Sequence, residues 1–178
     1  MTVVIGLFVF VTFFRATAFR LSVSRPTESQ LIESLGGAQV AAVIKNSQRT
    51  EVALIEPPDD KQSHPPNEFV DIGEPRTSPG ELAQDFRRIL LDPNENVRYA
   101  GMSKSCIPRY GVRVSFFAGQ DRVDVYLCFE CAIMATCLNG EPAGENNFEL
   151  AYRQLISDIR KIYPDDDGLA KLEARWRL

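Results

Sequence analysis

Alternating hydrophobic and polar residues are clearest in two neighbouring segments of the chain. In residues 112–116, and again in residues 123–129, a large apolar side chain occupies every second position. A period of two predicts β-strands that each bury one face. Between the two segments, the sequence Ala-Gly-Gln-Asp at residues 118–121 is typical of a tight turn. We therefore expect the two strands to form an antiparallel hairpin.

The apolar face of this hairpin also predicts how the two strands are aligned. A two-residue loop at Gly119 and Gln120 pairs apolar residues with one another: Val112 with Leu127, Val114 with Val125, and Phe116 with Val123. A shift of one residue would move these side chains to opposite faces, so the register is strongly specified. The other face then carries polar pairs: Ser115 with Asp124, Arg113 with Tyr126, and Arg109 with Glu130. We interpret Glu130 as half of a cross-strand ion pair and not as a catalytic acid.

Two further segments have the spacing of amphipathic helices. The first begins at Ser78, which can cap a helix, and Glu81 can complete a capping box. Its apolar residues recur every three or four positions up to Leu90. The second helix is expected over residues 146–163, where one apolar stripe faces the core: Phe148, Tyr152, Leu155, Ile159 and Ile162.

The end of the chain predicts a short terminal helix over residues 165–178. This segment opens with three consecutive carboxylates at Asp165, Asp166 and Asp167. The three can hold a cation, but they lack the ligand spacing of a calcium loop. We interpret them as caps of the terminal helix.

The remaining segments include three further β-prone runs. Residues 39–45 and 50–56 are rich in Val, Ile and Ala and are joined by a polar loop, so we expect a strand in each. Residues 57–77 contain five prolines, which indicates a long surface loop. A third β-prone run covers residues 132–138.

Together these elements predict an α+β fold. We expect an antiparallel sheet of about five strands with two main helices on one face, in the order β-β-α-β-β-β-α. The length of 178 residues fits one domain. We place this domain at residues 39–178, after a connector at residues 19–38.

The N-terminal residues form an almost continuous apolar run. Residues 3–14 would span about 18 Å as a helix, short of the roughly 30 Å hydrocarbon core of a membrane. Their length suits a signal peptide, and Ala16-Thr17-Ala18 matches a cleavage site. No basic residue precedes the run, which leaves two alternatives: a membrane anchor flanked by Arg15 and Arg20, or a buried element of the domain. We interpret residues 1–18 as a signal peptide or membrane anchor.

This interpretation predicts an extracytoplasmic protein, either secreted or membrane-anchored. Membrane association would then occur through residues 3–14. The net charge of −4, with Lys and Arg scattered along the chain, argues against a nucleic-acid partner. The single histidine, His64, lies in a polar and proline-rich stretch, where we expect a solvated loop residue.

No residue pattern in the sequence specifies a reaction. One histidine is too few for a His-rich metal site, and neither a phosphate-binding loop nor a catalytic triad is evident. We therefore expect no catalytic residues and no cofactor, and a structural or binding role in place of enzyme activity.

Four cysteines carry the most specific chemistry: Cys106, Cys128, Cys131 and Cys137. The hairpin register puts Cys106 and Cys131 on its apolar face and Cys128 on the opposite face. Exported proteins meet an oxidising compartment, so we predict a Cys106–Cys131 disulfide. Three alternatives stay open: a zinc site built from Cys106, Cys128 and Cys131 with Cys137 as a fourth ligand, thiol–disulfide chemistry at Cys128-Phe129-Glu130-Cys131, and inert buried thiols.

The cysteine-bearing segments also resemble a known family. Cys106-Ile107-Pro108-Arg109-Tyr110-Gly111 and Cys128-Phe129-Glu130-Cys131 are similar to a Cys-x-Pro-x-(Tyr or His)-Gly element and a Cys-Phe-x-Cys element. Both occur in a group of uncharacterised bacterial proteins that are often exported or membrane-attached. The resemblance covers roughly residues 50–170. It implies a shared fold and a joint role for Cys106, Cys128 and Cys131, and it implies no activity.

Overall fold

The computed structural model describes residues 26–59, 63–96 and 105–175. The expected signal peptide or anchor at residues 1–18 lies outside these ranges. Within the described ranges, no helix has the length and apolar character needed to cross a membrane.

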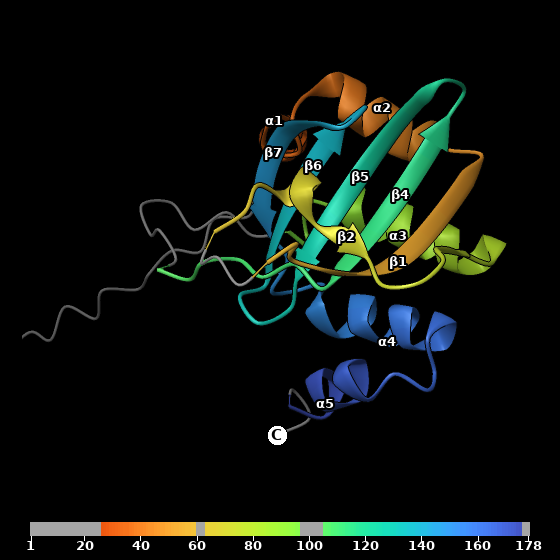
Figure 1. Cartoon of the computed structure of the whole chain (residues 1–178). Helices are drawn as coiled ribbons and strands as arrows, with labels where there is room; N and C mark the ends of the chain where they lie inside the picture. Colours follow the sequence, from red (N-terminus) through yellow and green to blue (C-terminus); the bar gives the residue numbers. More distant parts are fainter. Residues whose placement is uncertain (1–25, 60–62, 97–104, 176–178) are drawn as a thin grey trace, which may run out of the picture.

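The centre of the fold is an antiparallel sheet. Its strands lie in the order β2-β1-β4-β5-β6-β7, and β3 pairs with β1 beside β2 (Figure 1). The strands are β1 (Arg49–Glu56), β2 (Val70–Asp71), β3 (Arg76–Thr77), β4 (Val112–Ala118), β5 (Asp121–Cys128), β6 (Ile133–Leu138) and β7 (Glu141–Asn147). From β4 to β7 each strand pairs with the next one along the chain, so this part of the sheet is a simple meander.

The register predicted for the β4–β5 hairpin is confirmed. The three apolar pairs all form: Val112 with Leu127, Val114 with Val125, and Phe116 with Val123. The polar pairs Ser115–Asp124 and Arg113–Tyr126 also form. The Ser115 hydroxyl donates a hydrogen bond of 2.6 Å to Asp124 Oδ1.

In the described part of the chain, five α-helices accompany the sheet. They are α1 (Glu28–Ser34), α2 (Ala38–Asn46), α3 (Gly80–Leu91), α4 (Tyr152–Ile162) and α5 (Asp167–Arg175). One hydrophobic core joins the apolar faces of these helices to the inward side chains of β4 and β5, including Val114, Val125 and Phe116. Helix α5 packs against α4 at one end of the molecule (Figure 1).

The other face of the sheet carries a second, smaller apolar cluster. Its buried residues are Ala53, Ile55, Phe69, Tyr110, Tyr126, Cys128, Cys131, Ile133, Ala135 and Cys137. A segment of the proline-rich stretch, formed by the 3-10 helix η1 (Pro66–Glu68) and β2, crosses in front of this face (Figure 1). We call residues 66–72 the strap. Phe69 is its buried anchor, and its ring contacts the ring of Tyr110 at 5.3 Å between centroids.

The structure differs from the predicted fold in the first strand and in the number of strands. Residues 39–45 form helix α2, in which Val40, Val43 and Ile44 turn one face to the core. A short apolar run can be buried equally well as a helix or as a strand, so its composition does not distinguish the two. Helix α1 lies within the expected connector, and its Leu31 is buried in the core. The sheet is also larger than the predicted five strands, because β2, β3 and β7 contain few apolar residues and were not foreseen.

The ends of the two predicted helices need correction as well. Helix α3 begins after Pro79, and Ser78 makes no capping hydrogen bond to it. Ser78 instead donates its backbone N–H to the Thr50 carbonyl oxygen, beside the edge of the sheet. Helix α4 begins at Tyr152, since residues 146 and 147 belong to β7. The predicted cap of the terminal helix is confirmed at Asp166, which accepts a 2.7 Å hydrogen bond from the Leu169 N–H.

Candidate functional site

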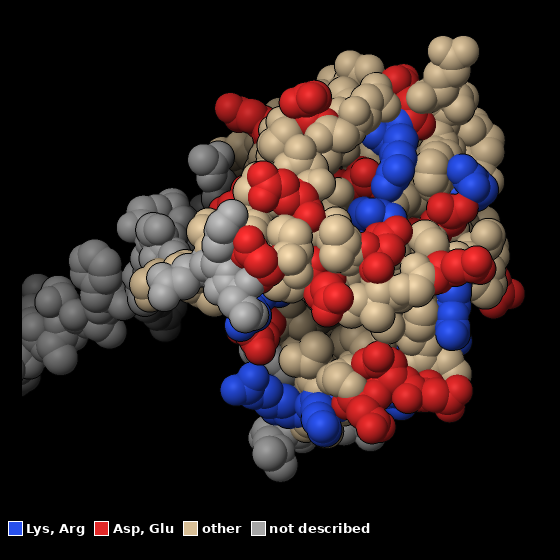
Figure 2. Space-filling model, viewed as in Figure 1, with Lys and Arg blue, Asp and Glu red and all other residues tan. Residues whose placement is uncertain are grey.

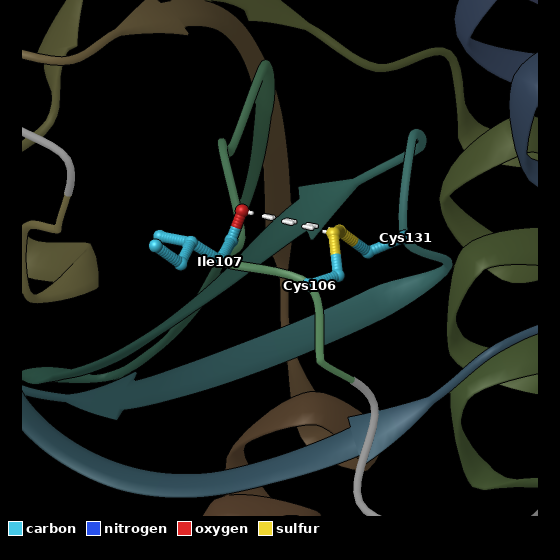
Figure 3. The surroundings of a disulfide bond; sticks show 3 residues. All are labelled: Cys106, Ile107 and Cys131. Carbon is cyan, nitrogen blue, oxygen red and sulfur yellow. Dashed lines mark hydrogen bonds between the residues drawn. A yellow bond between two sulfur atoms is a disulfide. The ribbon is translucent and has the colours of Figure 1, made fainter.

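A disulfide joins Cys106 to Cys131, as the sequence predicted. Their Cα atoms lie 6.2 Å apart, and the bridge closes a loop with a sequence separation of 25 residues. This loop contains the whole β4–β5 hairpin. The Ile107 carbonyl oxygen points at the bridge, 3.7 Å from Cys106 Sγ (Figure 3).

The predicted position of Cys131, on the apolar face of the β4–β5 hairpin, was wrong. Cys131 does not lie on the helix-covered face of the sheet but in the second cluster, together with Cys128. Strand β5 ends at Cys128, and a turn follows in which Ala132 has a positive φ of 51°. The alternation of faces therefore stops before Cys131, and the turn places its sulfur within reach of Cys106.

A pocket of about 590 Å³ opens beside the disulfide-closed loop. It lies between the two ends of that loop and helix α5, and its lining residues are Arg109, Tyr110, Gly111, Phe129, Glu130, Gly168, Lys171, Leu172 and Arg175. The cysteines of the bridge stand close in sequence to two of these segments. The crosslink therefore fixes the spacing of two walls of the pocket.

The charged residues of the pocket are mostly basic. Arg109, Lys171 and Arg175 are exposed, and within the described residues none of the three forms an ion pair. In the lower part of Figure 2, near α5, basic side chains lie beside a group of acidic ones, and the face above carries many acidic side chains with a few basic ones among them. Of the lining residues that the structure describes, Glu130 alone carries a carboxylate. The predicted Arg109–Glu130 ion pair is absent, because β5 ends before Glu130 and the register no longer holds there.

Aromatic and aliphatic side chains form the apolar part of the same pocket. Phe129 is 4% exposed, and its ring packs edge-on against Phe148 and Tyr152 at centroid distances of 5.3 and 5.1 Å. Leu172 lies on α5 between the two basic residues of that helix. Burial, followed by the charge of Glu145, raises the pKa of Tyr110 far above its ordinary value, so its hydroxyl stays neutral. The pocket thus combines a cationic rim with an apolar wall.

The other two cysteines are free thiols buried in the second cluster. Cys128 and Cys137 are each 0% exposed. Burial, together with a smaller effect of the neighbouring carboxylates Asp124 and Glu141, raises the pKa of Cys137 to about 11. A neutral, buried thiol is a poor nucleophile and a poor metal ligand.

The zinc alternative required three convergent thiolates at Cys106, Cys128 and Cys131. Two of these sulfurs are bonded to each other. Across the described residues, no group of three or more His, Cys, Asp or Glu side chains is arranged to hold a metal ion.

His64 is not the solvated loop residue that its sequence context suggested. Its side chain is 4% exposed and lies between two carboxylates of the same stretch, with Nε2 at 2.9 Å from Asp59 Oδ1 and Nδ1 at 3.1 Å from Glu68 Oε2. The ring also meets Phe69 edge-on at 6.2 Å. These contacts make His64 part of the support of the strap and not part of the pocket.

The basic residues of α5 were missed from the sequence. Lys171 and Arg175 are four positions apart, so they share one face of the helix, with Leu172 beside them. That spacing is readable in the sequence, but only the fold shows that this face meets the disulfide-closed loop.

No protein-family model, curated protein or solved structure matches this chain.

Proposed function

We propose that the chain is an extracytoplasmic, non-catalytic binding domain whose binding site is the pocket between α5 and the disulfide-closed loop. The observation that carries this proposal is the position of the Cys106–Cys131 bridge. It holds the segment with Arg109 and the segment with Phe129 and Glu130 at a fixed separation on two sides of the pocket. A rigid, preformed wall lowers the entropic cost of binding.

Disulfides persist in oxidising compartments, which supports export. The family resemblance of the segments around Cys106 and Cys128 points to the same location.

The chemistry of the lining favours binding over catalysis. Nucleophilic catalysis needs a nucleophile within reach of a base, and the described lining residues include no serine, threonine, cysteine or histidine. The only hydroxyl is that of Tyr110, which is held neutral by burial. Arginine, lysine and an aromatic wall are instead typical of groups that hold and orient a ligand.

The first test is the intact mass of the chain after export by a bacterial host, measured under native and non-reducing conditions. We expect one disulfide, which lowers the mass by about 2 Da, with two alkylatable thiols appearing only after denaturation and no added metal mass. A protein that carries four free thiols and one zinc ion would contradict the proposal. It would favour the alternative in which Cys106, Cys128 and Cys131 bind the metal.

A further inference from the structure

We propose that the pocket beside α5 binds a soluble organic anion, a phosphate or carboxylate group attached to an apolar body. This inference rests on the proposed binding role and names the class of ligand. It follows from the charges, the apolar wall and the size of the pocket, each of which restricts the ligand in a different way.

The charges of the lining call for an anion. Among the described lining residues, three cations and one carboxylate leave a net positive charge of two, on a chain whose net charge is −4. Lys171 and Arg175 stand one helical turn apart, a spacing at which like charges repel. Within the described residues no carboxylate of the protein pairs with either of them. A bound dianion would balance the charge that the protein leaves unbalanced.

The geometry of the cations favours a phosphate or carboxylate over a simple ion. Arg109 approaches from the segment that leads into β4, whereas Lys171 and Arg175 approach from α5. Guanidinium groups bind two oxygens of a carboxylate or phosphate at once, and lysine adds a point charge. Cations from two separate segments that line one pocket can therefore hold one group with several oxygens.

The apolar wall adds the second requirement. Phe129, Leu172 and Tyr110 all line the pocket. Inorganic phosphate would leave this surface wet, whereas an aromatic or aliphatic body would cover it and gain about 25 cal/mol for each Å² removed from water. The volume of about 590 Å³ falls in the range of small-molecule sites.

The rest of the surface argues for a small ligand over a nucleic acid. Acidic side chains are spread over the face that adjoins α5, with single basic side chains among them (Figure 2). A polyanion that followed the surface beyond the pocket would meet like charge. A ligand that ends within the pocket avoids this repulsion.

The test is a titration of the full, disulfide-bonded chain with phenyl phosphate, followed by calorimetry or amide NMR shifts. Inorganic phosphate and benzyl alcohol each carry one half of the proposed ligand, so we expect each to bind at least tenfold more weakly than phenyl phosphate. Lys171→Gln and Arg109→Gln should each weaken phenyl phosphate binding about tenfold, the loss typical of one charge-assisted hydrogen bond. Arg88→Gln, a matched change at an exposed arginine on α3 far from the pocket lining, should leave the affinity unchanged.

Three results would overturn the inference. They are an undetectable affinity for phenyl phosphate, an equal affinity for benzyl alcohol, and an equal loss of affinity in Arg88→Gln.

Binding to vesicles of phosphatidylglycerol distinguishes a lipid headgroup from a soluble anion as the ligand. Cosedimentation that Lys171→Gln abolishes, without binding of phenyl phosphate, would contradict a soluble ligand. A correctly formed disulfide without phenyl phosphate binding would reject this ligand class and leave the binding role intact, whereas free thiols with bound zinc would reject the binding role itself.

Discussion

Gly144 lies where β7 passes closest to the turn that follows α1. A methyl group added there would overlap the Ser34 carbonyl oxygen and lie 2.5 Å from the Gly36 nitrogen, both of them backbone atoms. Backbone cannot move aside as a flexible side chain can, so we expect Gly144→Ala to lower the free energy of unfolding by about 2 kcal/mol, as overpacking typically does. Urea unfolding measures this change.

The matched control is Gly80→Ala. An added methyl group at this position, in the first turn of α3, meets nothing within 4 Å. We expect no loss of stability in this variant, because alanine is the better helix former. A similar loss in both variants would show that the close contact at Gly144 is not the cause.

Cys137 predicts how stability depends on alkaline pH. Burial raises the pKa of its thiol from 9.0 to about 11 in the folded protein. Below about pH 9 the thiol is neutral in both states, so its contribution to stability is complete. Between about pH 9 and 11 the unfolded chain loses this proton and the folded protein keeps it, so stability falls as pH rises. Urea unfolding of the disulfide-bonded chain across this window should show the decline.

Cys137→Ala tests whether this thiol causes the decline. The variant should remove the decline between about pH 9 and 10, leaving the fall above about pH 10 that comes from Tyr110 and Tyr126, whose pKa values burial raises. An unchanged slope in the variant would contradict the assignment.

At the residue scale, the most accurate predictions from the sequence were the cross-strand pairs within the sheet. The pairing of Ser115 with Asp124 followed from alternation and was right. The environments of Glu130 and His64 depend on where a strand ends and on how a loop returns to the sheet. Neither is encoded in a period of two, so both predictions failed.

At the scale of elements, the disulfide closes a loop that contains the whole β4–β5 hairpin. Replacing both cysteines, Cys106→Ser with Cys131→Ser, should lower the free energy of unfolding by about 3 kcal/mol, the loop-entropy value for a separation of 25 residues. Denaturant unfolding measures the loss. Because the bridge also fixes two walls of the pocket, affinity for phenyl phosphate should fall in the same variant.

Reduction of the unmodified chain provides the control for that variant. A reducing agent should lower the stability of the unmodified protein by a similar amount and leave the double variant unaffected, since Cys128 and Cys137 are already free thiols. A further loss on reducing the double variant would reveal a second bridge and contradict the structure.

Elements with a strong period were predictable, and those without one were not. Two patterns are long: the apolar stripe from Phe148 to Ile162 and the alternation in β4 and β5. Each extends over several turns or residue pairs, which is long enough to distinguish a helix from a strand. Residues 39–45 are too short for that, and their Ala content suits the helix they form. Strand β7 contains Pro142 and Gly144 and buries little, so nothing in its own residues marks it as a strand. Residues 141–147 form a strand because they pair with β6, and not because of their own composition.

On the scale of the whole molecule, the sheet is covered differently on its two faces. Helices cover one face with a large core, whereas the strap covers the other through Phe69 and a few polar contacts. The strap is tied to the sheet by a 2.8 Å ion pair between Asp71 and Arg113, and Asn67 donates a hydrogen bond to the Gly140 carbonyl oxygen. The candidate site lies between α5 and the two ends of the disulfide-closed loop, so no single segment of the sequence contains it. The sequence therefore shows each basic residue but does not show that they line one pocket.

This asymmetry predicts that the strap opens before the protein unfolds. Cys128 and Cys137 lie in the cluster that contains Phe69, so their labelling by a thiol reagent under native conditions reports whether that cover opens. Asp71→Asn removes the ion pair to Arg113, which is worth about 1 kcal/mol at a partly buried site. We expect the variant to label roughly fivefold faster, because the free energy of opening the strap falls by about 1 kcal/mol. The global free energy of unfolding should fall by less than this amount. Arg88→Gln, which removes an exposed ion pair on α3, should leave the labelling rate unchanged. If labelling in every variant instead follows the global free energy of unfolding, the two faces open together and the strap is an integral part of a single cooperative unit.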